Sequence, residues 1–461
     1  MPSPLFRRLR RPPTLDLDDI QATLLRARPE PYFGTHAILE ITEPAAGREL
    51  LRRLAPRVTS AARWDEPQPS WLALALSYQG LVALGLPEAS LASFPANFRA
   101  GMAARAERLR DTGVNAPDRW EFPFGTTPRV HVAVTVYAAS EDDWRAEVAA
   151  YEKELGEVPG VRLLSHQDFA ADGFNVFGCR DGFSQPVVEG SGAEPLPGDG
   201  RPIKAGEFVL GYPSETGVPL PVPAPDVLGR NGTYVVFRKY HSHVAAFNKW
   251  LHDNASTEAE RELLAAKLVG RWRSGAPLAL TPERDTPAIG EDPNRINDFD
   301  YSADPRALRT PLGSHIRRMN PRDTKLTVLT DVNIRRIIRR GTSYGTPLPP
   351  DRLKDDGTPR GLDFIALGAR AIDNVEFLQS EWVGSGNFMG LSKEKDPMIS
   401  LQDKGAYFTV PGTPPRRVQN IQSFNTLLGG EYFFMPSLSE PVRHPLAQQQ
   451  LTPHPARRHS R

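Results

Sequence analysis

The chain has 461 residues, of which 39% are apolar and 24% charged, and 56 Lys and Arg against 55 Asp and Glu give a formal net charge of +1. A chain of this length can bury one or more sizeable cores. The even charge excludes an acidic disordered protein and gives no overall attraction to nucleic acid or membrane. The single cysteine, Cys179, excludes internal disulfides and any site made of several cysteines.

Residues 1–34 are expected to form an N-terminal arm. The opening MPSPLFRRLRRPP is basic, and LDLDDI follows where a secretory signal would need an apolar segment. No stretch approaches the ~18 consecutive apolar residues of a membrane span. We therefore expect a cytoplasmic protein.

Residues 35–171 alternate between strand and helix patterns. Polar residues alternate with valine over 129–138, as in a half-buried strand, and residues 141–158 begin with acids and place apolar side chains near helical spacing. The order of the expected elements is β-α-β-β-α-β, which is typical of a ferredoxin-like sandwich. In chain order they are residues 35–42, 45–58, 70–85 (a strand that becomes a helix around Tyr78), 129–138, 141–158 and 160–169.

The second half repeats this alternation after a loop-rich connection, residues 172–225. Its pattern predicts strands over 232–243, 336–345 and 361–369 and helices over 244–254, 257–274 and 373–383, while residues 324–332 fit both strand and coil. We therefore predict an α+β protein with two ferredoxin-like domains, antiparallel sheets with helices packed on them. The domains are residues 35–171 and 226–440, and residues 441–461 form a disordered basic tail.

One histidine of the ten, His315, lies in a segment suited to binding a cofactor. The segment PLGSHIRRMNPRD combines its imidazole with Arg317, Arg318 and Arg322. Imidazole is a good iron ligand, and guanidinium groups bind carboxylates such as those of a porphyrin. The alternative interpretation is an exposed basic loop, and the segment alone fits both.

A glycine-flanked aspartate, Asp181, lies in VFGCRDGFSQP. Gly178 and Gly182 allow the backbone to turn tightly and to approach a ligand. The pattern fits a carboxylate held over a reactive centre as an acid/base, and it also fits an ordinary Asp-Gly turn. No histidine partner can be assigned to Cys179 in the same segment, so we interpret it as a small loop residue.

Four arginines lie in RRIIRRGTSYG, residues 335–345. The interleaved Ile337 and Ile338 indicate that either Arg339 or Arg340 points inward, where a buried guanidinium must meet an acid or an anionic ligand. The alternatives are a solvated basic face and a nucleic-acid patch, and the overall charge of +1 disfavours the second.

Together, these three segments resemble the dye-decolorizing haem peroxidases, in particular their longer bacterial and fungal types. The resemblance rests on the GxxDG signature in FGCRDGFSQP, the HxRRxNPR-like run at His315 and the RRGxxYG run from Arg339. GLDFIALGA and GGEYFFMPSLS add support, and the likeness extends from about Thr35 to Leu438.

The resemblance implies a haem b cofactor in the C-terminal half, with His315 as the proximal axial ligand of its iron. It implies that Asp181 is the distal acid/base and that Arg339 is the distal arginine. The carboxylate that accepts the second ring proton of the proximal histidine is left open. The candidates are Glu376, Glu381, Glu394 and Asp396.

Three further residues match positions that surround the haem in this family. Arg322 would reach a propionate, and Leu362 and Phe364 would line the distal face and narrow the access of peroxide. Bulky dyes would then be oxidised at the surface through Trp382 or Tyr344.

The activity that the resemblance implies is the oxidation of dyes, phenolics or other bulky reductants by hydrogen peroxide through a ferryl haem intermediate. The alternatives are a non-catalytic haem-binding or storage protein and a deferrochelatase-like activity on the same fold. Asp181 and Arg339 favour the peroxidase, because haem storage requires neither. We expect peroxide and a reducing aromatic substrate as partners, no nucleic acid and no membrane, and either a monomer or a dimer.

Overall fold

The computed structural model describes residues 14–125, 129–322 and 331–439, and the structural statements below refer to these residues. The predicted tail, the first part of the predicted arm and most of the segment 324–332 lie outside them. Across the described ranges, no helix combines the length and the apolar character that a membrane crossing requires.

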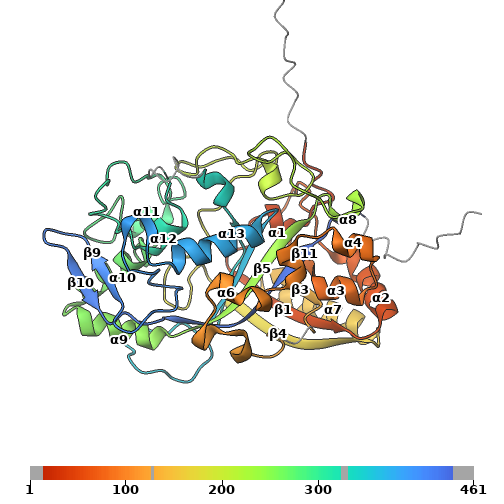
Figure 1. The fold of residues 1–461 in the computed structure, drawn as a ribbon, viewed down its shortest axis with the longest axis horizontal. Coiled ribbons are helices and arrows are strands. Elements are labelled where there is room, and N and C mark those ends of the chain that lie inside the picture. The colour runs from red at the N-terminus through yellow and green to blue at the C-terminus, as the bar shows by residue number, and fades with distance from the viewer. Residues whose placement is uncertain (1–13, 126–128, 323–330, 440–461) are drawn as a thin grey trace, which may run out of the picture.

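The first half of the chain folds into the β-α-β-β-α-β unit that its sequence predicts (Figure 1). Its strands pair antiparallel in the order β4-β1-β3-β2, and two helices pack on this sheet. The strands are β1 (Tyr32–Ile41), β2 (Ser70–Ser77), β3 (Val132–Ala138) and β4 (Val161–Ala171), and the helices are α2 (Pro44–Leu54) and α7 (Glu141–Gly156).

Local sequence explains where α7 begins. The hydroxyl of Ser140 accepts a hydrogen bond from the backbone N–H of Asp143 at 3.1 Å, and three acidic residues occupy the first turn. Both features stabilise a helix N-terminus, because they satisfy a free N–H group and complement the helix dipole.

The second half has the same strand arrangement, with more chain between the strands. Its strands take the order β11-β5-β8-β6, and β7 also pairs with β8. If β6 and β7 count as one strand position, both halves follow the 4-1-3-2 order. The strands are β5 (Thr233–Ser242), β6 (Ile338–Arg339), β7 (Thr342–Tyr344), β8 (Gly361–Gly368) and β11 (Asn425–Met435).

The helices of this half lie within its long connections. The predicted helix over 257–274 ends early, because Gly270 adopts a left-handed conformation with φ of +99°. The predicted strand over 336–345 is divided into β6 and β7. The main helices are α9 (Val244–Asn254), α10 (Glu258–Val269), α12 (His315–Met319), α13 (Ala371–Phe377) and the π-helical η8 (Leu378–Val383).

Several shorter elements complete the fold. A separate hairpin pairs β9 (Tyr407–Val410) with β10 (Arg416–Gln419), and it lies with α9–α12 at one end of the molecule (Figure 1). The short helices are α1 (Ala22–Leu25), α3 (Tyr78–Ala83), α4 (Glu88–Ala92), α5 (Ala96–Ala100), α6 (Ala106–Leu109), α8 (Asp226–Gly229) and α11 (Pro287–Glu291).

The two halves are joined into one nine-stranded sheet. β2 pairs with β11 through Ser77 opposite Phe433 and Leu76 opposite Phe434. β4 and β7, from opposite halves, are also in contact, so the sheet curves around an aromatic interior. That interior includes Tyr32, Trp71, Tyr137, Phe169 and Tyr344.

Two titratable residues, His36 of β1 and Asp363 of β8, lie in the buried interior. His36 is bonded on both ring nitrogens, to Thr135 Oγ1 at 3.0 Å and Thr342 Oγ1 at 2.9 Å, and burial lowers its pKa to about 3. Asp363 is fully buried, and neither carboxylate oxygen has a hydrogen-bond partner within the described ranges. Burial raises the pKa of Asp363 to about 7, which the charge of Lys239 only partly offsets.

Residues 14–31, within the predicted arm, pack into the core. Leu15, Ile20 and Leu24 are buried there. The side chain of Gln21 donates to the backbone oxygens of Leu74 and Pro436, both at 2.9 Å. Through Gln21, this segment therefore connects β2 with Pro436, near the end of the described chain.

Candidate functional site

His315 is the first residue of α12 and is held by a buried carboxylate. Its Nδ1–H donates to Asp396 Oδ2 at 2.9 Å, while Asp396 Oδ1 accepts from the backbone N–H groups of Met398 and Ile399 at 2.9 and 3.0 Å. Burial alone raises the pKa of Asp396, but the imidazole of His315 outweighs it and holds the pKa below its usual range. The pair fixes the orientation of the ring and leaves Nε2 available to a ligand.

The other three candidate carboxylates are occupied elsewhere. Glu376 accepts from Arg105 at 2.8 and 2.7 Å, and Glu381 accepts from Arg108 at 3.4 Å. Glu394 Oε2 accepts from the backbone N–H of Thr409 at 3.2 Å, while its buried Oε1 has no hydrogen-bond partner among the described residues, His315 included.

The two arginines that follow His315 are buried, so the exposed-loop interpretation of this segment is wrong. Arg317 donates to Asp304 Oδ2 at 3.1 Å, and Arg318 donates to the backbone oxygens of Trp382 at 2.9 Å and Glu394 at 2.6 Å. Both side chains therefore anchor the short helix that carries the histidine.

Asp181 lies on a tight hairpin. Its N–H donates to Gly173 O at 2.8 Å, and its Oδ1 accepts from the N–H of Gly182 at 2.7 Å. Gly178 and Gly182 have φ values of +74° and +91°, which explains the glycines of the signature. The segment is therefore an Asp-Gly turn that also presents a carboxylate. Cys179 in the same hairpin is buried, and burial raises the pKa of its thiol, so it is not an activated nucleophile.

Arg339 lies next to the Asp181 hairpin. Its Nη2–H donates to the backbone oxygens of Phe183 at 2.8 Å and Ser184 at 3.3 Å, and its backbone N–H donates to Gln185 Oε1 at 2.9 Å. Nη1 and Nε have no hydrogen-bond partner among the described residues. Burial lowers the pKa of Arg339, and the nearby charge of Asp181 opposes that shift.

The neighbouring Arg340 takes the other direction and packs into the protein. Its Nε donates to the backbone oxygen of Thr23 at 2.8 Å, and its side chain is buried. The expectation of one inward arginine in this run is thus confirmed for Arg340, but its hydrogen-bond partners are backbone oxygens and not the predicted acid or anionic ligand. Arg339 faces the hairpin of Asp181.

Leu362 and Phe364 share a face of the sheet with Arg339. The register places Arg339 opposite Ala366 of β8, and side chains of directly opposed residues lie on one face. Leu362, Phe364 and Ala366 alternate along β8 on that face, and the first two remain partly exposed. Asp363 points to the opposite face.

Arg322 is part of a group of arginines that the sequence indicated only partly. It donates to Phe299 O at 2.7 Å and its guanidinium lies 3.9 Å from the centre of that ring. Burial, together with the charges of Arg322 and Arg339, lowers the pKa of Arg336 to about 10. Burial likewise lowers the pKa of Arg271 to about 9, and the same two arginines contribute again.

Such a group attracts negative charge, and the nearby carboxylates of Asp199 and Asp181 already oppose the lowering of the pKa of Arg336 and Arg339. Both arginines are partly exposed, although burial lowers their pKa. Neither Arg271 nor Arg336 was predicted as a site residue. Arg336 lay in the arginine-rich run that was noted, whereas nothing in the sequence around Arg271 distinguishes it.

The contacts thus assemble two groups, the His315–Asp396 pair and the Arg339–Asp181 hairpin. The charges of Arg322 and Arg339 both act on Arg336, so the arginine group adjoins the second of these groups. A further apolar cavity of about 330 Å³ borders the hairpin at Phe174 and β7 at Ser343.

Comparison with known proteins shows to which family a chain with these two groups of residues belongs. No model of a known protein family matches the chain. The chain is 32% identical over 466 residues to the dye-decolorizing peroxidase AauDyP1 of Auricularia auricula-judae, with 92% of this chain and 86% of that protein covered. Identity to a dye-decolorizing peroxidase of Exidia glandulosa is 30%, with the same coverage. The chain belongs to the dye-decolorizing peroxidase family.

Solved structures agree with this membership. An ancestral D-type dye-decolorizing peroxidase superposes with a TM-score of 0.82 at 30% identity, covering 94% of this chain and all of that one. A fungal DyP-type peroxidase from Auricularia auricula-judae gives 0.80 at 27% identity, covering 94% and 99%. The predicted α+β fold is confirmed, and the protein is an oxidoreductase of the peroxidase type.

Peroxidases of this family are haem enzymes, and the residues present fit a haem. The donor set contains an imidazole whose Nδ1 is committed to a carboxylate, as proximal histidines require. The arginine group supplies positive charge for a bound anion, and Leu362 and Phe364 supply a partly exposed apolar surface beside it.

Proposed function

We propose that this chain is a haem b peroxidase that uses hydrogen peroxide to oxidise dyes, phenolics and other bulky reductants. In this proposal His315 binds the haem iron through Nε2, Asp181 is the distal acid/base and Arg339 is the distal arginine. The observation that carries the proposal is the hydrogen bond between His315 Nδ1 and the buried Asp396. A carboxylate in this position makes the ring a stronger ligand and fixes its plane.

Haem contacts follow from the same geometry. Arg322, with Arg336 and Arg271, would neutralise the propionates, because their positive charges lie close enough to act on one another and so attract negative charge. Leu362 and Phe364 would line the distal face and exclude larger molecules from it. When bound, the haem supplies the redox centre at which peroxide is reduced and the donor is oxidised.

Asp181 would act as the acid/base that transfers the proton. Its Oδ1 already accepts from Gly182, so Oδ2 is the oxygen free to take a proton from peroxide and to return it to the departing oxygen. Arg339 is anchored through Nη2, which leaves Nη1 and Nε to donate to the developing negative charge. Together, the two side chains separate proton transfer from charge stabilisation.

Neither predicted relay presents an exposed ring. Trp382 and Tyr344 are 5% and 4% exposed. Trp382 remains our candidate, because Arg318, on the helix of His315, donates to its backbone oxygen. Tyr344 donates to Tyr240 O at 2.9 Å in the interior of the sheet. The haem b type, the domain boundaries and the cytoplasmic location also stay predictions.

The test is a visible spectrum of the purified holoprotein before and after one equivalent of peroxide, followed by addition of a dye and of a phenol. We expect the spectrum of a histidine-ligated ferric haem, which changes rapidly when peroxide is added. When the dye or the phenol is then oxidised, the spectrum should return to that of the ferric protein. A haem band that peroxide leaves unchanged would instead indicate a haem-binding or storage protein.

A further inference from the structure

A polar cavity of about 680 Å³ lies apart from the residues described above. Its walls come from residues 104–115, from residues 379–384 in and after η8, and from residues 395–403. None of His315, Asp181 and Arg339 lines it. Its volume lies within the range of about 300–1,000 Å³ that is usual for small-molecule sites. We propose that this cavity binds a small organic polycarboxylate, with Arg110 as the principal anchor.

Among the charged lining residues, the exposed cation Arg110 and the exposed anion Glu107 have no oppositely charged partner within the described chain, so the lining can accept an anion at Arg110. Of its four cations, Arg105 is neutralised by the bidentate Glu376 and Lys395 by Asp403 at 2.8 Å. Arg108 reaches Glu381 only at 3.4 Å, and both side chains are exposed. Within the described chain, Arg110 contacts no carboxylate. The charged lining residues are Arg105, Glu107, Arg108, Arg110, Glu381, Lys395 and Asp403.

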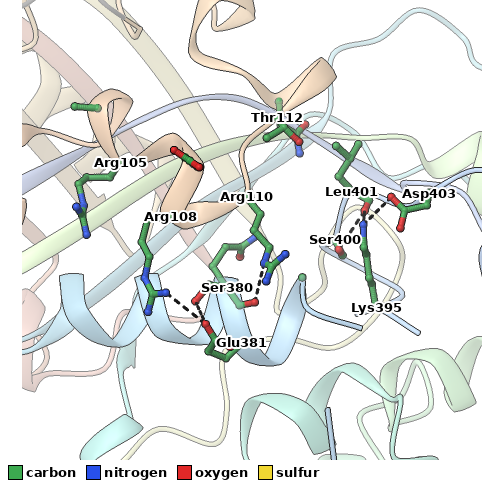
Figure 2. A pocket seen from close by; sticks show the side chains of 15 residues that line it. Arg105, Arg108, Arg110, Thr112, Ser380, Glu381, Lys395, Ser400, Leu401 and Asp403 are labelled. Carbon is green, nitrogen blue, oxygen red and sulfur yellow. Dashed lines mark hydrogen bonds and ion pairs between the residues drawn. The ribbon is translucent and has the colours of Figure 1, made fainter. Parts of the chain in front are cut away.

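The position of Arg110 is built by the backbone around it. Arg110 ends α6 in the left-handed region, with φ of +59°. Its Nε donates to Ser380 O at 2.8 Å (Figure 2). A Cβ atom at Gly384 would lie 2.5 Å from Arg110 Cδ, so a glycine is needed there for the side chain to lie as it does.

This anchoring selects the atoms that face a ligand. With Nε bonded to Ser380 O, the described residues provide no partner for Nη1 and Nη2 of Arg110. Two parallel N–H groups on one guanidinium form the fork that binds a carboxylate in a bidentate manner. A second carboxylate of the same molecule can reach Arg108, whose bond to Glu381 is long.

The rest of the lining indicates a polar ligand and disfavours an aromatic dye. Leu401 is the one large apolar side chain of the described lining. Uncharged donors and acceptors predominate among the remaining positions, and they are suited to hydroxyl groups between the acid groups. They are Thr112, Asn115, Gln379, Ser380 and Ser400.

The first experiment is isothermal titration of citrate into the holoprotein and into Arg110→Asn. Asparagine tolerates the left-handed conformation, so the substitution removes the guanidinium without adding backbone strain. Arg119→Asn is the matched control, because Arg119 is exposed and lies outside the cavity. We expect saturable binding that weakens about tenfold or more in Arg110→Asn and is unchanged in Arg119→Asn.

A second variant tests position separately from charge. Gly384 has φ of −98° and ψ of −11°, which alanine adopts without strain. Gly384→Ala therefore keeps every charge and displaces Arg110, although its Cβ also lies 3.0 Å from the backbone oxygen of Gln379. We expect citrate binding to weaken several-fold, and the unfolding temperature, measured in parallel, to fall only slightly.

Two results would overturn the proposal. The first is the absence of saturable citrate binding, or equal affinity in Arg110→Asn and the wild type. The second is preference for inorganic phosphate over citrate with the same dependence on Arg110, which would assign the cavity to another class of anion. The titration requires no peroxide turnover, so its outcome is independent of the function proposed above.

Discussion

The two halves of the sheet share one strand order and differ in what lies between the strands. In the first half, the connection from β1 to β2 spans residues 42–69 and contains α2 as its main helix. In the second, the corresponding connection from β5 to β6 spans residues 243–337 and contains α9, α10, α11 and α12. The proposed haem ligand lies in that longer connection.

The faces of the two half-sheets differ accordingly. In the first half, α7 covers the outer face closely enough for Trp144 Nε1 to donate to Thr35 Oγ1 at 2.8 Å. In the second, Leu362 and Phe364 of β8 remain partly exposed beside Arg339. The comparison teaches that one fold serves as scaffold twice, and that longer connections and an uncovered face convert the second copy into a site.

The largest effect is expected at His315, the proposed haem ligand in the longer connection of the second half. His315→Ala should abolish stable haem binding, because the imidazole is the proposed iron ligand, while the folded sheet remains. Haem content per protein and circular dichroism measure the two properties. His166→Ala, in the first half, is the control and should retain haem. Full haem occupancy in His315→Ala would exclude this histidine as the ligand.

The next effect concerns Arg339, on the partly exposed face of β8, and Asp181, on the neighbouring hairpin. Arg339→Leu should slow the peroxide-dependent change in haem absorption about 10²–10³-fold, and at least as much as Asp181→Asn. The reason is that Arg339 is fixed by Phe183 and Ser184, whereas Asp181 depends on the position of its hairpin. Both variants should retain haem, and stopped-flow mixing with peroxide measures the two rates. A near-native rate for Arg339→Leu beside an inactive Asp181→Asn contradicts the expectation.

The interior provides a second contrast, between the satisfied His36 and the unsatisfied Asp363. Because burial raises the pKa of Asp363 to about 7, the folded state holds its proton more tightly than the unfolded chain does. Stability from this group is present at low pH and is lost as the pH rises towards 7. Between pH 5 and pH 8 the free energy of unfolding of the wild type should fall by roughly 3 kcal/mol more than that of Asp363→Asn. Denaturant unfolding measures the difference, and equal pH dependence in both would refute it.

The smallest effect is expected at Asp396, the residue that accepts a hydrogen bond from His315. Asp396→Asn leaves the imidazole in place but weakens the bond that orients it, so haem should be lost about 10–100-fold faster. Transfer of haem to an acceptor protein measures the rate. Glu381→Gln, a rejected candidate on the surface, should leave the rate unchanged. If it had the larger effect, the assignment of Asp396 would be wrong.

The strands and main helices of the first half were predictable from sequence, whereas its short helices α1, α4, α5 and α6 were not assigned. The strand and helix over 70–85 divide at Ser77, where the pattern changes period, and α7 carries its start signals locally. Such features depend on neighbours in the chain, which a sequence displays directly.

The second half and the site were only partly predictable. β11 was not assigned as a strand, because its role depends on pairing with β5 and β2, which lie far away in the sequence. Asp396 could not be separated from three glutamates, since it lies 81 residues from His315. The site segments themselves were found because the motifs around His315, Asp181 and Arg339 are local.

The pairing of β11 also sets an order of events during synthesis. The four strands of the first half are complete once residue 171 has been made, whereas β5 gains its second neighbour only with residues 425–435, close to the end of the chain. Pairing of such distant segments is slow compared with local structure formation. The first half can therefore be folded while the ribosome is still producing the second, and it then offers β2 as the edge onto which the last strand docks. If the second half holds the haem, as we propose, its site is complete only after the last strand has docked, so we expect haem to bind the finished chain and not the nascent one.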